Sequence, residues 1–186
     1  SLTYTPVWPE KNGIRGIIAL DQQYGEIMET IVAECIEKCA CRTVFCGGAG
    51  GYIPGEEDVH RPPIGSRIAV RRCMHPDGET VYLDHDLNQS SSLESAMHLH
   101  VPSIFCETFD WLEDARDQGS SVDIELFHIL KAISSHNERH AEDPVAGDLG
   151  YFVSDYVGEK PLREYSGVFD NYAQAIRSFL NTILGK

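Results

Sequence analysis

The sequence has no run of about eighteen consecutive apolar residues, the length that a membrane-spanning helix needs. Residues 1–9 also lack the basic start and the apolar core that are typical of a secretory signal peptide. We therefore expect a cytoplasmic protein that neither spans nor binds a membrane.

Positive charge is scarce. The chain has 15 lysine and arginine residues against 29 aspartate and glutamate residues, and its formal net charge is −14. A protein that binds phosphate backbones or anionic lipids needs a basic surface. The charge balance therefore argues against nucleic acid and anionic membranes as partners.

The sequence motifs of several common sites are absent. None of the six cysteines forms a Cys-x-x-Cys pair, so we expect neither a zinc site nor a disulfide framework. Neither a Gly-x-Ser-x-Gly motif nor a Walker-type phosphate loop is present. His98 and His100 could supply two metal ligands, but no third ligand is close in the sequence, and we expect no metal.

The length of 186 residues fits one domain, residues 1–186, which can bury roughly 70% of its unfolded surface. We expect residues 1–13, with two prolines and little periodicity, to be an irregular lead-in. Apolar runs predict strands at 14–20, 43–46, 101–106 and 149–155, and a hairpin within 66–83. Apolar residues at helical spacing predict helices at 25–38 and 109–118, after residue 125, and near the C-terminus.

Strands that alternate with helices predict an α/β fold. The segments 14–20, 25–38 and 43–46 predict a strand–helix–strand unit whose two strands run parallel.

The segment from Thr43 to Gly51 joins a short apolar strand to four glycines. Glycine is common in turns, so the pattern predicts a tight turn at Gly47–Gly51. Small ligands of α/β proteins bind beyond the carboxyl ends of the strands, and this turn could form the floor of such a site. The alternative is a turn that binds no ligand.

Three carboxylates stand at the predicted ends of elements. Asp123 and Glu125 come where a helix starts, so they could cap the helix, or Glu125 could bind the hydroxyl groups of a sugar. Asp155 ends a strand, where it could form a turn. If burial raised its pKa, Asp155 could instead donate a proton.

Taken in order, three motifs resemble those of the nucleoside phosphorylase/nucleosidase superfamily, which includes the purine nucleoside and uridine phosphorylases and methylthioadenosine nucleosidase. They are Gly47–Gly51, Val122-Asp-Ile-Glu125 and Val153-Ser-Asp155. The likeness extends over residues 14–184. It implies a three-layer α/β/α fold with a mixed central sheet.

The resemblance also implies an enzyme that cleaves the N-glycosidic bond of a purine-like nucleoside, by hydrolysis or phosphorolysis. Glu125 would hold the ribose and Asp155 would protonate or hold the base, as the two catalytic residues. It implies a homo-oligomer, no cofactor, and phosphate only as a co-substrate. Further substrate contacts are expected from Gly47, Gly48, Ala49, Gly50, Phe109, Asp123, Phe152 and Ser154.

Two positions depart from the superfamily. A serine that contacts phosphate falls on Gly48, and an arginine of the hexameric phosphorylases falls on Phe45. Each lost charge-assisted contact would weaken phosphate binding by about 1.5–3 kcal/mol, which favours hydrolysis. The chain also starts after strands that supply a further arginine and, in nucleosidases, a catalytic glutamate. The alternative is therefore a catalytically incomplete nucleoside-binding module that a partner chain completes.

Overall fold

The computed structural model describes residues 2–5, 17–20, 25–55, 58, 60–87, 97–159, 174, 177 and 181. No helix within these residues is long and apolar enough to cross a membrane. The elements are β1 (Leu2–Thr5), β2 (Ile17–Leu20), α1 (Ile27–Cys39), β3 (Thr43–Tyr52), β4 (Arg67–Ala69), β5 (Arg72–Met74), β6 (Thr80–Tyr82), β7 (His98–His100), the 3₁₀ turn η1 (Ile104–Cys106), α2 (Phe109–Gln118), β8 (Ser121–Asp123), α3 (Leu126–Arg139) and β9 (Ala146–Tyr156).

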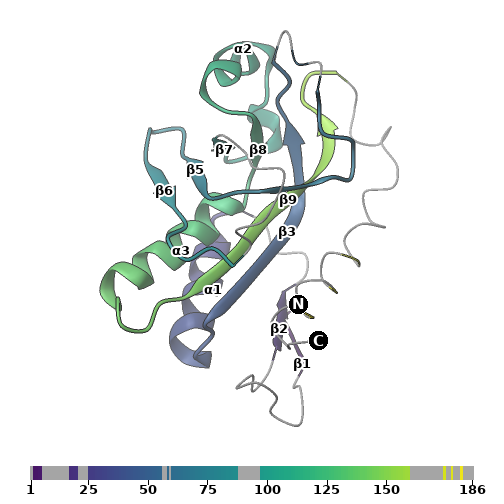
Figure 1. The fold of residues 1–186 in the computed structure, drawn as a ribbon. Helices are drawn as coiled ribbons and strands as arrows, with labels where there is room; N and C mark the ends of the chain where they lie inside the picture. Colours follow the sequence, from purple (N-terminus) through teal and green to yellow (C-terminus); the bar gives the residue numbers. More distant parts are fainter. Residues whose placement is uncertain are drawn as a thin grey trace.

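A mixed seven-stranded sheet forms the centre of the fold, in the order β4-β9-β3-β8-β7-β5-β6 (Figure 1). The long strands β3 and β9 run parallel, and β8 and β4 pair antiparallel with their outer edges. Strands β7 and β5 continue the sheet parallel to β8, and β6 closes it as a hairpin with β5. The predicted mixed α/β sheet and the predicted hairpin are confirmed.

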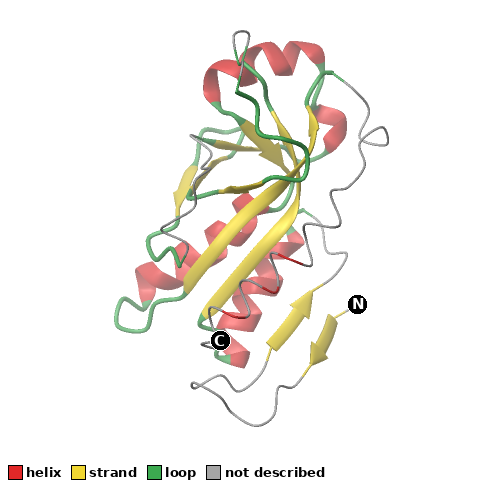
Figure 2. Ribbon diagram, turned by 45° about the vertical axis from the view of Figure 1, so that its right-hand side comes forward, coloured by secondary structure: helices red, strands yellow, loops and turns green. Residues whose placement is uncertain are grey.

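Helices α1 and α3 lie side by side against one face of β3 and β9 (Figures 1 and 2). Apolar residues at helical spacing face this sheet because burying them removes apolar surface from water. Val32, Ile36, Leu130 and Ile133 belong to the same buried cluster as Leu149 of β9. The predicted helices at 25–38 and 109–118 are confirmed. The predicted C-terminal helix lies outside the described residues, apart from Gln174, Arg177 and Asn181, which are helical.

Several local predictions are wrong. Residues 2–5 form strand β1, where an irregular lead-in was expected. Strand β2 pairs with β1, and the parallel neighbour of β3 is β9, so the strand–helix–strand pairing does not form as predicted. Residues 104–106 form a 3₁₀ turn after β7 has ended at His100. The three-residue strand β8 is too short to leave a periodic signal.

The glycines at 47–51 lie inside strand β3, so the predicted turn is also wrong. The parallel register with β9 continues through them, with an irregularity between Gly50 and Gly51. A Cβ atom on Gly50 would lie 2.6 Å from the Tyr151 ring, and one on Gly51 would lie 2.6 Å from Val157. These glycines allow close packing of neighbouring side chains. At Gly48, by contrast, no described atom lies within 4 Å of an added Cβ.

We predict that Gly50→Ala lowers the free energy of unfolding by about 1–3 kcal/mol, because the fully buried Tyr151 ring cannot move away from the new methyl group. Gly48→Ala is the matched control on the same strand and should change stability by less than about 1 kcal/mol. Urea denaturation of both variants measures the difference. Equal effects would show that the contact with Tyr151 is not what requires glycine.

Candidate functional site

The three motifs found in the sequence lie on three adjacent strands. Strand β8 pairs with the end of β3 at Gly51↔Val122, and on the other side of β3 Asp155 of β9 pairs with the same Gly51. A Cβ on Gly51 would lie 3.3 Å from Val122 and 3.9 Å from Oδ1 of Asp155. The fold therefore brings the glycine segment, the Asp123–Glu125 segment and the Ser154–Asp155 segment together around β3.

Asp123 caps helix α3. Its Oδ1 accepts hydrogen bonds from the backbone N–H groups of Glu125, at 3.2 Å, and Leu126, at 3.0 Å. The sequence predicted that Asp123 or Glu125 could cap this helix, and the structure shows that Asp123 does so. Glu125 occupies the N-cap position itself but makes no capping hydrogen bond with its side chain. Its carboxyl group is therefore not used by the helix.

The Glu125 carboxyl lies in a largely buried environment. Burial, followed by the nearby charge of Asp123, raises the pKa of Glu125 to about 8, although the backbone N–H groups of Gly25 and Ile124 act in the opposite direction. The two acids also help to raise the pKa of the Cys46 thiol to about 12, mainly because that thiol is buried. The Glu125 carboxyl is therefore close enough to act on the Cys46 thiol, and it is mostly protonated at neutral pH.

Asp155 is held by its neighbour Ser154. The Ser154 hydroxyl lies 2.5 Å from Oδ1 of Asp155 and 3.0 Å from the carbonyl oxygen of Gly50. One hydroxyl proton cannot serve both acceptors at once. When Asp155 is protonated, it can donate to Ser154 while Ser154 donates to Gly50. Burial raises the pKa of Asp155 and so favours this arrangement, against the opposing effect of the Ser154 hydrogen bond.

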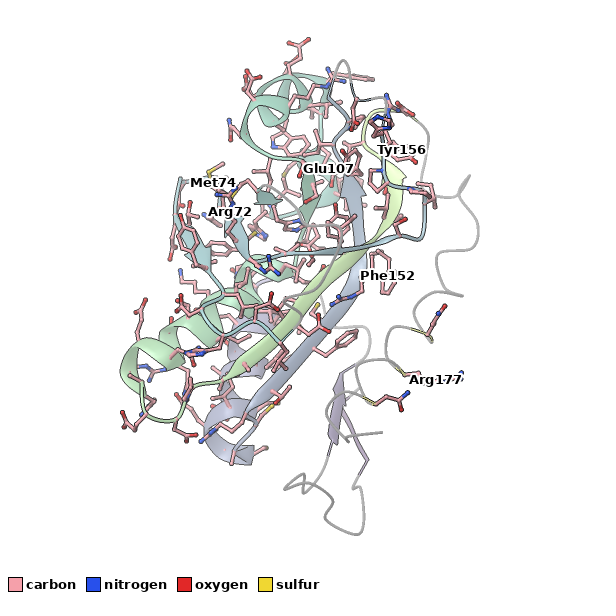
Figure 3. The ribbon with its side chains drawn as sticks, viewed as in Figure 1. Arg72, Met74, Glu107, Phe152, Tyr156 and Arg177 are labelled. Carbon is pink, nitrogen blue, oxygen red and sulfur yellow. The ribbon has the colours of Figure 1, made fainter. Side chains whose placement is uncertain are left out.

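Glu107 is a third acid of this region. Burial raises the pKa of Glu107 to about 7, and the charge of Asp155 adds to the effect. Figure 3 shows Glu107 toward the end of the sheet at which β3 and β9 finish, near Tyr156. Sequence analysis did not single out Glu107, although Phe109, two residues later, was an expected substrate contact. Its proximity to Asp155 depends on the turn η1 and could not be read from spacing.

Not all of the predicted contacts lie together. The Phe152 ring packs over Gly47. Successive side chains of a strand point to opposite faces, so Gly47, Ala49 and Phe152 lie on the face of the sheet opposite to Cys46, whose thiol pKa the Glu125 charge helps to raise. Phe152 is 2% exposed and Phe109 is 78% exposed, at the start of α2. Gly48 shares the face of Cys46.

The two histidines of β7 are both buried. His98 lies between Ser121 and Asp123, and His100 stacks on His75 with ring centroids 5.3 Å apart. Among the residues that the structure describes, no group of three or more histidine, cysteine, aspartate or glutamate side chains is placed to hold a metal ion.

No family model and no curated protein matches the chain by sequence. Solved structures do match it. The 5′-methylthioadenosine/S-adenosyl homocysteine nucleosidase of Campylobacter jejuni has a TM-score of 0.72 at 12% identity, over 100% of this chain and 90% of that one. The chain has the nucleosidase fold. This fold is shared by the methylthioadenosine nucleosidase of Arabidopsis thaliana (TM-score 0.67, 15% identity, 96% of this chain and 75% of that one). It is also shared by the futalosine hydrolase of Helicobacter pylori (TM-score 0.65, 11% identity, 99% of this chain and 88% of that one).

The likeness confirms the phosphorylase-like α/β fold that the three motifs implied. At identities of 11–15% it establishes the nucleosidase fold alone. The roles of Glu125, Asp155 and Glu107 therefore have to be argued from their own surroundings.

We predict that Glu107→Gln stabilises the protein relative to wild type at pH 8 but not at pH 5. The pKa of Glu107 is raised in the folded state, so wild-type stability is lost as pH rises from the unfolded value toward about 7, and glutamine has no charge to bury. Because Glu107 keeps part of its hydration, we expect a difference of about 1 kcal/mol between the two pH values.

Urea denaturation at both pH values measures this difference. The exposed Glu113→Gln on α2 is the control and should show no dependence on pH. A Glu107→Gln effect that is equal at pH 5 and pH 8 would contradict the burial of a titrating carboxyl.

Proposed function

We propose that this protein cleaves the N-glycosidic bond of a purine nucleoside by hydrolysis. One observation carries the proposal. In a nucleosidase fold, two acids have pKa values raised by burial: Glu125, which follows β8, and Asp155 of β9, and these two strands pair with opposite edges of the end of β3. The similar structures are enzymes named for 5′-methylthioadenosine, S-adenosylhomocysteine and futalosine, which gives the class of substrate to test.

The arrangement suits a nucleoside that lies along β3. Glu125 follows β8 and Asp155 lies on β9, and these two strands pair with opposite edges of the end of β3, at Gly51. The ribose would lie at Glu125 and the base at Asp155.

The two acids would do different work. As the bond between the sugar and the base breaks, its electron pair moves to the base, and positive charge develops on the ribose ring. The Glu125 carboxylate would accept hydrogen bonds from the ribose hydroxyl groups and stabilise this charge. Protonated Asp155 would donate to the base and make it a better leaving group. Water would then add to the sugar carbon and lose a proton.

The glycine segment offers few polar side chains that could bind phosphate. Gly48 and Phe45 carry no polar side chain. The nearby Arg67 is already committed, since its Nη2 donates to Asp148 Oδ1 at 2.7 Å and to the carbonyl oxygen of Cys46 at 3.3 Å. Breaking this half-buried ion pair would leave Asp148 without its partner. This supports water over phosphate as the attacking group.

We predict that Glu125→Gln and Asp155→Asn each lower kcat on 5′-methylthioadenosine by about 10²–10⁴-fold, since each removes one acid from the reaction. Release of free adenine measures the rate, and the wild-type rate should not depend on added phosphate. Glu113→Gln on α2 is the matched control and should leave the rate unchanged.

Other nucleosides, including S-adenosylhomocysteine and futalosine, are assayed in parallel. Calorimetry that shows nucleoside binding by wild type without turnover would instead support the incomplete binding module. If variants of Glu125 and Asp155 bind and cleave nucleosides like wild type, neither nucleoside cleavage nor nucleoside binding takes place at this site.

The pH dependence of a double variant, Asp155→Asn with Glu107→Gln, isolates Glu125. Neither asparagine nor glutamine titrates, so ionisation of Glu125 is left to control the residual kcat/KM. Because only the carboxylate stabilises positive charge on the ribose, kcat/KM should rise about tenfold per pH unit and level off above about pH 8. A flat profile between pH 6 and pH 9 would contradict the role given to Glu125.

A further inference from the structure

A groove lies between the start of α1, the turn of the β5–β6 hairpin and the first half of α3. The hairpin and α1 both pack against α3, so three segments that are far apart in the sequence meet here (Figure 1). The volume of the groove is about 620 Å³, which is within the range of small-molecule sites. Neither Glu125 nor Asp155 lines it. The groove is therefore a second candidate site, separate from the proposed catalytic acids.

The groove carries four carboxyl groups and one ammonium group. Glu26 and Glu29 line it from α1, Asp77 and Glu79 line it from the hairpin turn, and Lys131 lines it from α3. Lys131 pairs with Glu79, with Nζ 2.8 Å from Oε2. Among the residues that the structure describes, no lysine or arginine forms an ion pair with Glu26, Glu29 or Asp77. The backbone N–H of Glu79 lowers the pKa of Asp77, so this carboxyl stays charged. Negative charge is thus left in excess on both sides of the groove.

The groove already accommodates one alkylammonium group, that of Lys131. Its Nζ lies 5.4 Å from the centroid of the Phe127 ring, and its hydrogen bond with Glu79 raises the pKa of the lysine. Both contacts favour a cation. Ile27, which is 52% exposed, and the half-buried ring of His75 offer further apolar surface. A carbon chain that ends in an ammonium group is therefore the chemistry that suits these walls.

One nitrogen on the wall of the groove lacks a partner. His128 is 8% exposed, and its Nδ1 makes no hydrogen bond. Oε2 of Glu29 is 3.5 Å away, which is longer than a normal N–H···O hydrogen bond. A buried polar atom without a partner costs free energy. Because the Glu29 side chain is 40% exposed, it can shift to admit a ligand ammonium group, which can donate both to Glu29 and to Nδ1 when the ring proton is on Nε2.

We propose that this groove binds a small aliphatic diamine in its diammonium form. One ammonium group lies at Glu29 and His128, and the other lies at Asp77. The carbon chain between them lies against Ile27 and His75. Two ammonium groups fit better than one because the carboxylates without a lysine or arginine partner stand on opposite sides of the groove.

Calorimetry on the full chain at low ionic strength is the direct test. The probes are diaminobutane and diaminopentane, each with an amino group at both ends. We expect both to bind about fivefold more tightly than aminobutane, which forms one ion pair fewer. Butanediol, which carries no charge, should not bind. Because the contacts are ionic and partly exposed, added salt should weaken diamine binding.

Two variants test the assigned contacts in opposite directions. Asp77→Asn should lower the affinity for diaminobutane about fivefold, to the level of aminobutane, while the affinity for aminobutane is kept. Lys131→Met keeps a carbon chain but removes the competing ammonium group and leaves Glu79 without it, so it should raise the affinity for diaminobutane about fivefold. The exposed Glu113→Gln on α2 is the matched control for a change of one charge and should have no effect.

Circular dichroism establishes that each variant is folded. Equal affinities for diaminobutane and aminobutane, or weaker diamine binding in Lys131→Met, would overturn the proposal. Binding of a lysine-rich peptide without binding of either diamine would also overturn it and would assign the groove to a protein partner. If no nucleoside is cleaved but the diamines bind as expected, the proposed function fails and the diamine site stands.

Discussion

The parallel pairing of β3 with β9 forms the centre of the sheet, and the neighbouring strands and the candidate acids are positioned by it. It runs from Thr43↔Ala146 to Tyr52↔Tyr156 and forms the longest ladder of the sheet. Its close approach depends on glycines, because Tyr151 and Val157 occupy the space where side chains on Gly50 and Gly51 would stand. The same ladder sets Asp155 opposite Gly51. It also leaves the other edge of β3 free for β8, which delivers Asp123 and Glu125.

Burial then decides the chemistry of these acids. Glu107, Glu125 and Asp155 all have pKa values raised first by burial, and in two cases next by a neighbouring carboxylate. Keeping carboxyl groups partly buried near one another lowers stability above neutral pH, since ionisation is then opposed by both desolvation and repulsion. Perturbed acids gathered near the end of β3 are more typical of a functional site than of a structural ion-pair network, in which opposite charges would lower these pKa values.

The sequence predicts those features that depend on local pattern. The spacing of apolar residues predicted α1 and α2 correctly, because the buried face of a helix recurs every three to four residues and is visible in a short stretch of sequence. The glycine segment was misread as a turn because glycine serves turns and close packing alike. The partner that decides between them, Tyr151, is a hundred residues away in the chain. Glu107 was missed for the same reason, because it is linked to the site through Asp155, which only the folded chain brings near.

In the proposed reaction, the ionisation of Glu125 would link its burial to catalysis by differential binding. A free site that keeps Glu125 neutral would not hold a neutral nucleoside strongly through charge. As the glycosidic bond broke, the ribose would become cationic and favour the carboxylate form, so Glu125 would interact more strongly with the transition state than with the substrate.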